Sequence, residues 1–216
     1  MGIERGWCVM GRWAMGALLM CVAGWASAAE PLFGKYNYGA AQKGFGKPQG
    51  FVECLQPMGV TARCKDGVDY AGTRFRLALT FDKQKLVEAV LYSEYNDAAY
   101  RRVLQEVAKR FMLVAIADDK NVVDVLAHTL NPNRTEADAK AIGDFETHAL
   151  RNGMISYRLY EQLDQYIKPG LDARQVLATV LASIRVAEVT VKHGKSDNWL
   201  IVKFSKPGLA PKKPKA

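Results

Sequence analysis

The chain has 216 residues, a formal net charge of +8 and a sequence pI near 9.3. It lacks the helical zinc-protease motif, the serine-hydrolase elbow, the phosphate-binding glycine loop and the dinucleotide fingerprint. Its three histidines do not share a helix turn or lie beside cysteines or clustered carboxylates, so we expect no catalytic set, metal site or cofactor.

Residues 1–28 are typical of a secretory signal peptide. Arg5 and Arg12 form a basic start, an uncharged apolar stretch follows, and small residues end at Ala28, where we expect cleavage. We therefore expect a periplasmic protein. The uncharged run over residues 13–29 is at the short limit for a membrane span, so an N-terminal anchor remains an alternative, as does secretion.

Cleavage after Ala28 removes two of the four cysteines and leaves Cys54 and Cys64. Both lie in a predicted hairpin over residues 51–64, with Pro57-Met58-Gly59 at its reversal. A chain folded about Gly59 sets the two cysteines opposite each other, with their Cβ atoms roughly 4.5–5.5 Å apart. A disulfide is therefore expected in an exported protein, and two free thiols are the alternative.

A second hairpin is predicted over residues 74–92. Its first strand alternates apolar and more polar side chains, and residues 82–85 form its turn. The returning strand, residues 86–92, is apolar on both sides and is expected to be central in a sheet. The preceding residues 29–50 are rich in glycine and aromatic residues and are expected to lie across the sheet as an irregular lead-in.

After Tyr92 the apolar period changes from two to 3.6, which predicts helices. The predicted helices cover residues 97–112, 118–130, 135–150 and 172–184. The first has an apolar stripe of Tyr100, Val103, Leu104, Val107 and Phe111. Residues 113–117 form an apolar run of unassigned type.

Residues 154–167 fit two interpretations. Apolar residues from Ile155 to Tyr166 suit a helix, whereas the alternation over residues 154–160 suits a strand, and we favour the helix. A last hairpin pairs residues 186–193 with 198–205. The sum is one α+β domain over residues 29–205, with a mainly antiparallel sheet of four to six strands from both ends of the chain, packed against helices from its middle.

Residues 206–216 are expected to form a disordered basic tail with three prolines. Four of the seven net positive charges of the processed chain belong to this tail and are carried by Lys206, Lys212, Lys213 and Lys215. The folded body is then too weakly basic for nucleic-acid binding. At most, these lysines make peripheral contact with an anionic membrane or polyanion.

We expect a non-catalytic exported binding protein that acts on another envelope or secreted protein, as an inhibitor, an immunity factor or an envelope-assembly accessory. The candidate partner-binding residues are Tyr157, Tyr160, Tyr166 and Trp199, for which core packing is an equal explanation. One alternative is an envelope hydrolase whose carboxylates meet only in the fold, although Glu88 and Glu94 by themselves do not indicate a glycosidase. Another is a polyanion or membrane-surface binder that uses the tail.

Overall fold

The computed structural model describes residues 31–151, 153–194 and 197–209. The predicted signal peptide and residues 210–216 lie outside this part of the chain. The strands are β1 (Pro31–Phe33), β2 (Tyr36–Asn37), β3 (Val52–Leu55), β4 (Thr61–Tyr70), β5 (Thr73–Asp82), β6 (Lys85–Glu94), β7 (Phe111–Ala117), β8 (Val122–Asp124), β9 (Met154–Glu161), β10 (Val186–His193) and β11 (Asn198–Ser205). The helices are α1 (Asp97–Ala108), α2 (Val125–Leu130), α3 (Glu136–Arg151) and α4 (Ala173–Thr179). Short 3-10 turns are η1 (Gln42–Gly44), η2 (Lys47–Gln49), η3 (Leu163–Tyr166) and η4 (Pro207–Leu209).

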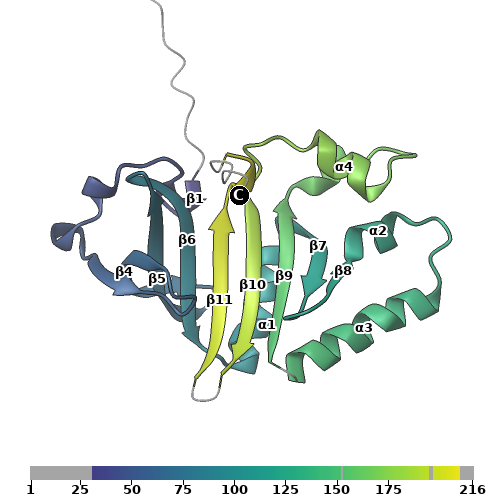
Figure 1. The fold of residues 1–216 in the computed structure, drawn as a ribbon, viewed down its shortest axis with the longest axis horizontal. Coiled ribbons are helices and arrows are strands. Elements are labelled where there is room, and N and C mark those ends of the chain that lie inside the picture. The colour runs from purple at the N-terminus through teal and green to yellow at the C-terminus, as the bar shows by residue number, and fades with distance from the viewer. Residues whose placement is uncertain (1–30, 152, 195–196, 210–216) are drawn as a thin grey trace, which may run out of the picture.

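An antiparallel sheet of nine strands organises the described residues, in the order β3-β4-β5-β6-β11-β10-β9-β7-β8, and β1 and β2 form a separate two-stranded antiparallel sheet. The predicted final hairpin, β10–β11, joins the N-terminal strands to those from the middle of the chain, because β11 pairs with β6. β6 therefore has a partner on each side, as its two apolar faces predict. Figure 1 shows α2, α3 and α4 grouped near the β7–β8 end of the sheet, away from β4 and β5.

The α+β class with a mainly antiparallel sheet is confirmed, but the sheet has more strands than the four to six expected. The prediction of a helix over residues 154–167 is wrong, because Met154–Glu161 forms β9 between β10 and β7. Ile155, Tyr157 and Leu159 follow a period of two and are buried in the main core. The helical spacing belongs only to η3, after a bend at Gln162, whose φ is +48°.

Other helix predictions hold in part. α1 begins where predicted, with the Asn96 side chain accepting a hydrogen bond from the Ala99 N–H, but it ends at Ala108. Phe111 enters the core from β7 instead. The predicted helix over residues 118–130 divides into β8 and α2, and the one over residues 172–184 ends at Thr179. The helix over residues 135–150 corresponds to α3.

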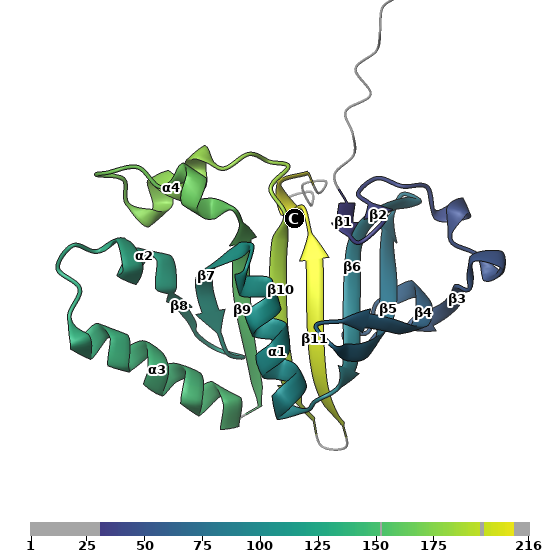
Figure 2. The ribbon, with the colours of Figure 1, turned by 180° about the vertical axis from the view of Figure 1, so that it is seen from behind.

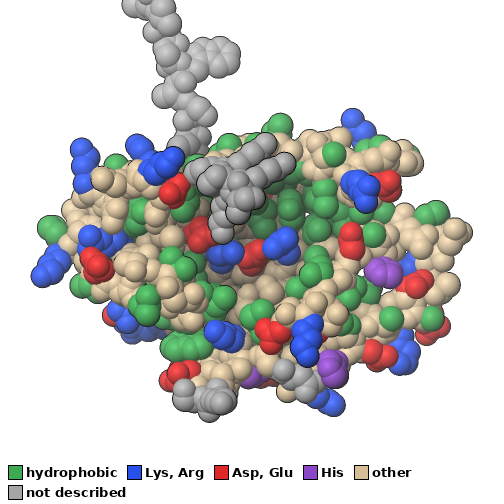
Figure 3. All heavy atoms as spheres, viewed as in Figure 1, with side chains coloured by type: hydrophobic (Ala, Val, Ile, Leu, Met, Phe, Trp, Pro, Cys, Tyr) green, Lys and Arg blue, Asp and Glu red, His purple; other side chains and the backbone are tan. Residues whose placement is uncertain are grey.

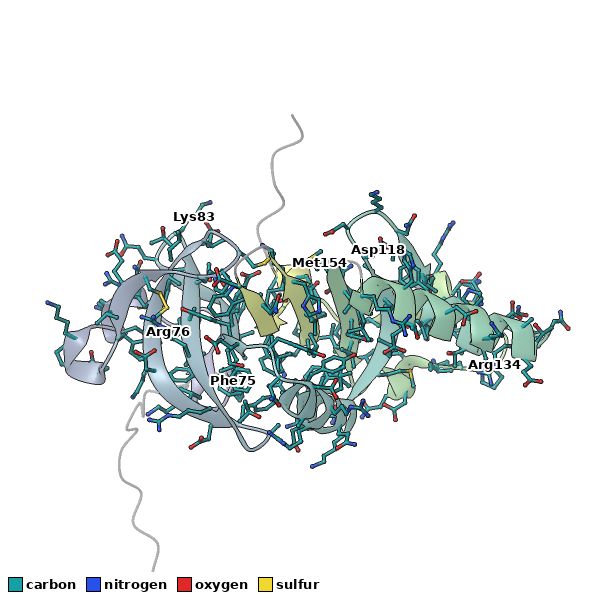
Figure 4. All side chains as sticks on the ribbon, turned by 90° about the horizontal axis from the view of Figure 1, so that it is seen from below. Phe75, Arg76, Lys83, Asp118, Arg134 and Met154 are labelled. Carbon is teal, nitrogen blue, oxygen red and sulfur yellow. A yellow bond between two sulfur atoms is a disulfide. The ribbon has the colours of Figure 1, made fainter. Side chains whose placement is uncertain are left out.

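The two faces of the sheet carry separate buried clusters. The main core includes side chains from β5, β6, β9, β10 and β11 and is covered by α1, which crosses the strands in Figure 2. On the other face, α2, α4 and η3 cover β7 in a smaller core that contains Val114, Leu126 and Leu163. In Figure 4, Phe75 and Arg76 mark neighbouring positions of β5 that face opposite sides, since only Phe75 belongs to the main core.

The first described residues are held on the body by Arg185. Its guanidinium donates hydrogen bonds to the carbonyls of Pro31 and Leu32 and to the carboxylate of Glu161. The Phe33 ring stacks on Phe204, with ring centroids 5.4 Å apart. These contacts connect a segment near the expected cleavage site to residues more than 150 positions away.

The start of the expected tail is packed rather than disordered. Lys206 is buried, and Pro207–Leu209 forms η4. The Tyr38 hydroxyl donates a hydrogen bond to the Leu209 carbonyl at 2.9 Å. Lys212, Lys213 and Lys215 lie outside the described residues. Among the helices that the structure describes, none is long and apolar enough to cross a membrane.

Candidate protein-binding edge

The β3–β4 hairpin exposes most of the large apolar side chains that the described part of the molecule leaves uncovered. Seven such side chains are exposed, and four of them belong to this hairpin. They are Val52 (45% exposed), Leu55 (68%), Met58 (51%) and Val60 (41%). Single exposed apolar residues are common, whereas several on one short element are typical of an interaction site. We call these four residues the apolar tip.

The reversal of this hairpin is centred on Met58, one residue earlier than predicted. The Gln56 N–H donates to the Val60 carbonyl at 3.1 Å, and the Gly59 N–H donates to the Gln56 carbonyl at 2.8 Å. Cys54 therefore pairs in register with Ala62, not with Cys64. The disulfide between Cys54 and Cys64 is nevertheless formed across the diagonal, with a Cα–Cα distance of 5.9 Å.

β3 is an open edge of the sheet, because no described strand pairs with its outer side. Residues 56 and 60 share the hydrogen bond that closes the hairpin, and hydrogen-bonded pairs alternate along antiparallel strands. The N–H and C=O groups of Glu53 and Leu55 therefore point away from β4, toward the open side. Such unpaired groups are a template for an additional strand from another chain.

Two adjacent hollows lie beside this edge, and we call them together the Arg63 groove. One, of about 240 Å³, is lined by Gln42, Glu53, Thr61, Ala62, Arg63 and Phe81. The other, of about 300 Å³, is lined by Gln42, Lys43, Phe45, Gly46, Arg63 and Gln84. The groove lies on the face of the main core, since Arg63 pairs in register with the core residue Leu79.

The predicted partner-binding residues are not brought together. Tyr157 is 3% exposed in the main core, whereas Tyr160 and Tyr166 pack against the smaller core under α2 and α4. The Trp199 ring packs edge-on against Tyr92, with centroids 5.8 Å apart, on another part of the sheet. These aromatic side chains therefore do not form one surface.

Tyr157 lies instead in a buried chain of hydrogen bonds. Its hydroxyl donates to the Glu146 carboxylate at 2.6 Å and therefore accepts from the Tyr100 hydroxyl. Burial raises the pKa of Tyr100 to about 12. Burial, together with the hydrogen bond to Glu146, also raises the pKa of Tyr157. These hydrogen bonds link α1, β9 and α3, so Tyr157 has a structural role.

Two carboxylates with little exposed area, Glu161 and Glu188, are engaged in ion pairs. Burial raises the pKa of Glu188, but the Lys203 ammonium and the Arg158 guanidinium outweigh it and hold that pKa below its usual value. Glu161 pairs with both Arg110 and Arg185. On the face seen in Figure 3, acidic and basic side chains are interspersed rather than segregated.

Two further observations concern catalytic or metal chemistry. Glu88 and Glu94 are six residues apart on one strand, which places them about 20 Å apart at the usual rise. Paired glycosidase carboxylates are about 5–9.5 Å apart, so this pair does not form such a site. Within the described residues, no group of three His, Cys, Asp or Glu side chains is placed to hold a metal ion.

Comparison of the chain with models of protein families, with curated proteins and with solved structures finds no match. The candidate site therefore depends on its own geometry. The sequence predicted the disulfide of this hairpin but not a binding role for it. The available signal was the position of Met58 and Val60 around Gly59, because reversals are usually polar.

Proposed function

We propose that this chain is a non-catalytic exported binding protein that holds another envelope or secreted protein at the β3–β4 hairpin. An inhibitor, an immunity factor and an envelope-assembly accessory are the roles that fit such a protein. The observation that carries the proposal is the apolar tip beside an open strand edge. The Cys54–Cys64 disulfide supports export to the periplasm, since such crosslinks persist in oxidising compartments.

The hairpin has two physical sources of affinity. Full burial of an exposed Leu or Met side chain contributes roughly 1.5–3 kcal/mol, so covering the apolar tip supplies several kcal/mol. The outward N–H and C=O groups of Glu53 and Leu55 offer main-chain hydrogen bonds to an incoming strand. The disulfide also holds the hairpin in one conformation, which lowers the entropic cost of association.

The proposal is tested by capture from envelope extract with the processed chain, residues 29–216, followed by mass spectrometry. The test variant replaces Leu55, Met58 and Val60 by Ser. The matched control replaces Val122 and Leu181, which are exposed elsewhere, by Ser. We expect the wild type and the control to retain the same partner, and the hairpin variant to lose it without a change in melting temperature.

Retention of that partner by the folded hairpin variant contradicts the proposal. The competing role of the basic tail is tested with a chain that ends at Leu209. This truncation removes Lys212, Lys213 and Lys215 but keeps the contact between Tyr38 and Leu209. Loss of the partner in the truncated chain alone transfers the binding role from the hairpin to the tail.

A further inference from the structure

We infer that the bound segment of the partner is an extended strand that carries a carboxylate, and that the Arg63 groove receives this carboxylate. The inference rests on the proposed function, because it identifies the chemistry that pairs with the open edge of β3. The occupant of the groove is then an acidic stretch of polypeptide.

Side chains that line the Arg63 groove can donate further hydrogen bonds. Within the described chain, the only polar contact of the Arg63 side chain is with Glu53 at 3.7 Å, beyond hydrogen-bond range. By contrast, the Arg158 guanidinium donates two hydrogen bonds to Glu188, at 3.1 and 2.9 Å. A guanidinium has five donors in a fork that matches a carboxylate, so Arg63 can accept a further anionic partner.

The other polar side chains that line the Arg63 groove also have unused hydrogen-bonding groups. The side chains of Gln42, Lys43 and Gln84 make no hydrogen bond or ion pair with any described residue. Lys43 and Arg63 place two positive charges in the groove, against the single negative charge of Glu53. Glu53 is held only by the long contact with Arg63 and has a 69% exposed side chain, so it can move aside. The groove is therefore complementary to an anion.

The register of the hairpin predicts the spacing of the ligand. Leu55 pairs with Thr61, and Glu53 pairs with Arg63, so the two pairs are successive positions on one face. Same-face residues on a strand added beside β3 are two positions, or about 6.7 Å, apart. One aliphatic side chain of that strand then lies beside Leu55, and a carboxylate two residues away lies beside Glu53, on the face that also carries the Arg63 side chain of β4.

A displayed library of random heptapeptides, selected on the processed chain, tests the inference. We expect enrichment of peptides with Asp or Glu two positions from Leu, Ile or Val. A synthetic peptide from the selection should bind about tenfold more weakly to Arg63→Gln, since charge-assisted bidentate hydrogen bonds contribute to this extent. Glu53→Gln should bind it up to about fivefold more tightly, because a like charge is removed.

Arg134→Gln is the matched control, because Arg134 lies on the α2–α3 loop at the far end of the molecule in Figure 4. It should leave peptide affinity unchanged. Selected peptides without acidic preference, or equal affinity for Arg63→Gln and wild type, overturn the inference. If selected peptides without acidic preference still shift the amide resonances of Glu53 and Leu55, the proposed docking at β3 stands. In that case only the recognition of a carboxylate by the Arg63 groove is contradicted. Peptides that map elsewhere, or no enrichment at all, count against both.

Discussion

The two ends of the nine-stranded sheet differ in how their apolar side chains are covered. β3, with four residues, and β8, with three, are both short edge strands. At the β8 end, α2 and α4 bury the apolar side chains, among them Leu126 and Leu163. At the β3 end, no described helix covers the hairpin, and a disulfide crosslinks it instead. The crosslinked end therefore gathers four exposed large apolar side chains on one hairpin, whereas the helix-covered end exposes only scattered ones, Val122 of β8 and Leu181 after α4, among the described residues.

The largest expected effect comes from the same substitution at both ends. Leu126→Ala should lower the free energy of unfolding by about 2–4 kcal/mol, because Leu126 is fully buried and the change leaves a cavity. Leu55→Ala should lower it by less than about 0.5 kcal/mol, because that side chain is already exposed. Urea unfolding followed by circular dichroism measures both. Equal losses contradict the difference in burial between Leu126 and Leu55.

The disulfide is next in size. Closing a loop of 10 residues should contribute roughly 2–3 kcal/mol, because the crosslink lowers the chain entropy of the unfolded state. The variant with Cys54→Ala and Cys64→Ala should lose about that amount, and wild type with reductant serves as its control. Faster hydrogen exchange should be confined to the β3–β4 hairpin. Alkylation of both cysteines in unreduced, denatured wild type shows instead that no crosslink forms.

Alkaline pH should destabilise the region in which α1 and α3 pack against β9. The pKa of Tyr100 is raised from 10.0 to about 12 in the fold, so the neutral phenol is favoured there. Its contribution to stability is complete below the unfolded pKa near 10 and is lost as the pH rises toward 12. Each such tyrosine steepens the fall in unfolding free energy by about 1.4 kcal/mol per pH unit.

Tyr100→Phe removes one such titration. Between pH 10 and 11.5, its unfolding free energy should therefore fall less steeply than that of wild type. Urea unfolding at several pH values measures the slopes, with Tyr166→Phe, at a tyrosine of η3, as the control variant. Identical slopes for Tyr100→Phe and wild type exclude the assigned role of Tyr100.

The smallest effect is a gain, at the β5–β6 turn near the open end. Lys83 and Gln84 have φ values of +45° and +62°, in the left-handed region that non-glycine residues adopt at a cost. Asn and Gly suit these two positions, so Lys83→Asn with Gln84→Gly should raise the unfolding free energy by about 0.5–1 kcal/mol. Thermal unfolding measures the gain. Lys85→Asn, outside the turn, should leave the unfolding free energy unchanged. A lower unfolding free energy in the double variant contradicts the proposed backbone strain at Lys83 and Gln84.

The sequence by itself determined the parts of the fold whose signals are local. The alternation of β5 and β6, the final hairpin and the cap of α3 each depend on residues a few positions apart. Thr135 and Asp138 cap α3, with the Asp138 N–H donating to the Thr135 hydroxyl at 3.2 Å. The cysteine pairing also followed from chain proximity and from the oxidising compartment expected for this chain. Its register did not, because a one-residue shift of the reversal leaves the composition of the hairpin unchanged.

Only the tertiary structure decided which surfaces are covered. Residues 154–161 fit a helix or a strand locally, and pairing with β10 and β7 on both sides selected the strand. Tyr157 is buried because its partner Tyr100 comes from α1, 57 residues away. Leu55 is exposed because α2 and α4 pack at the other end of the sheet. Whether a side chain is covered depends on contacts between distant segments. The periodicity within one segment does not specify those contacts.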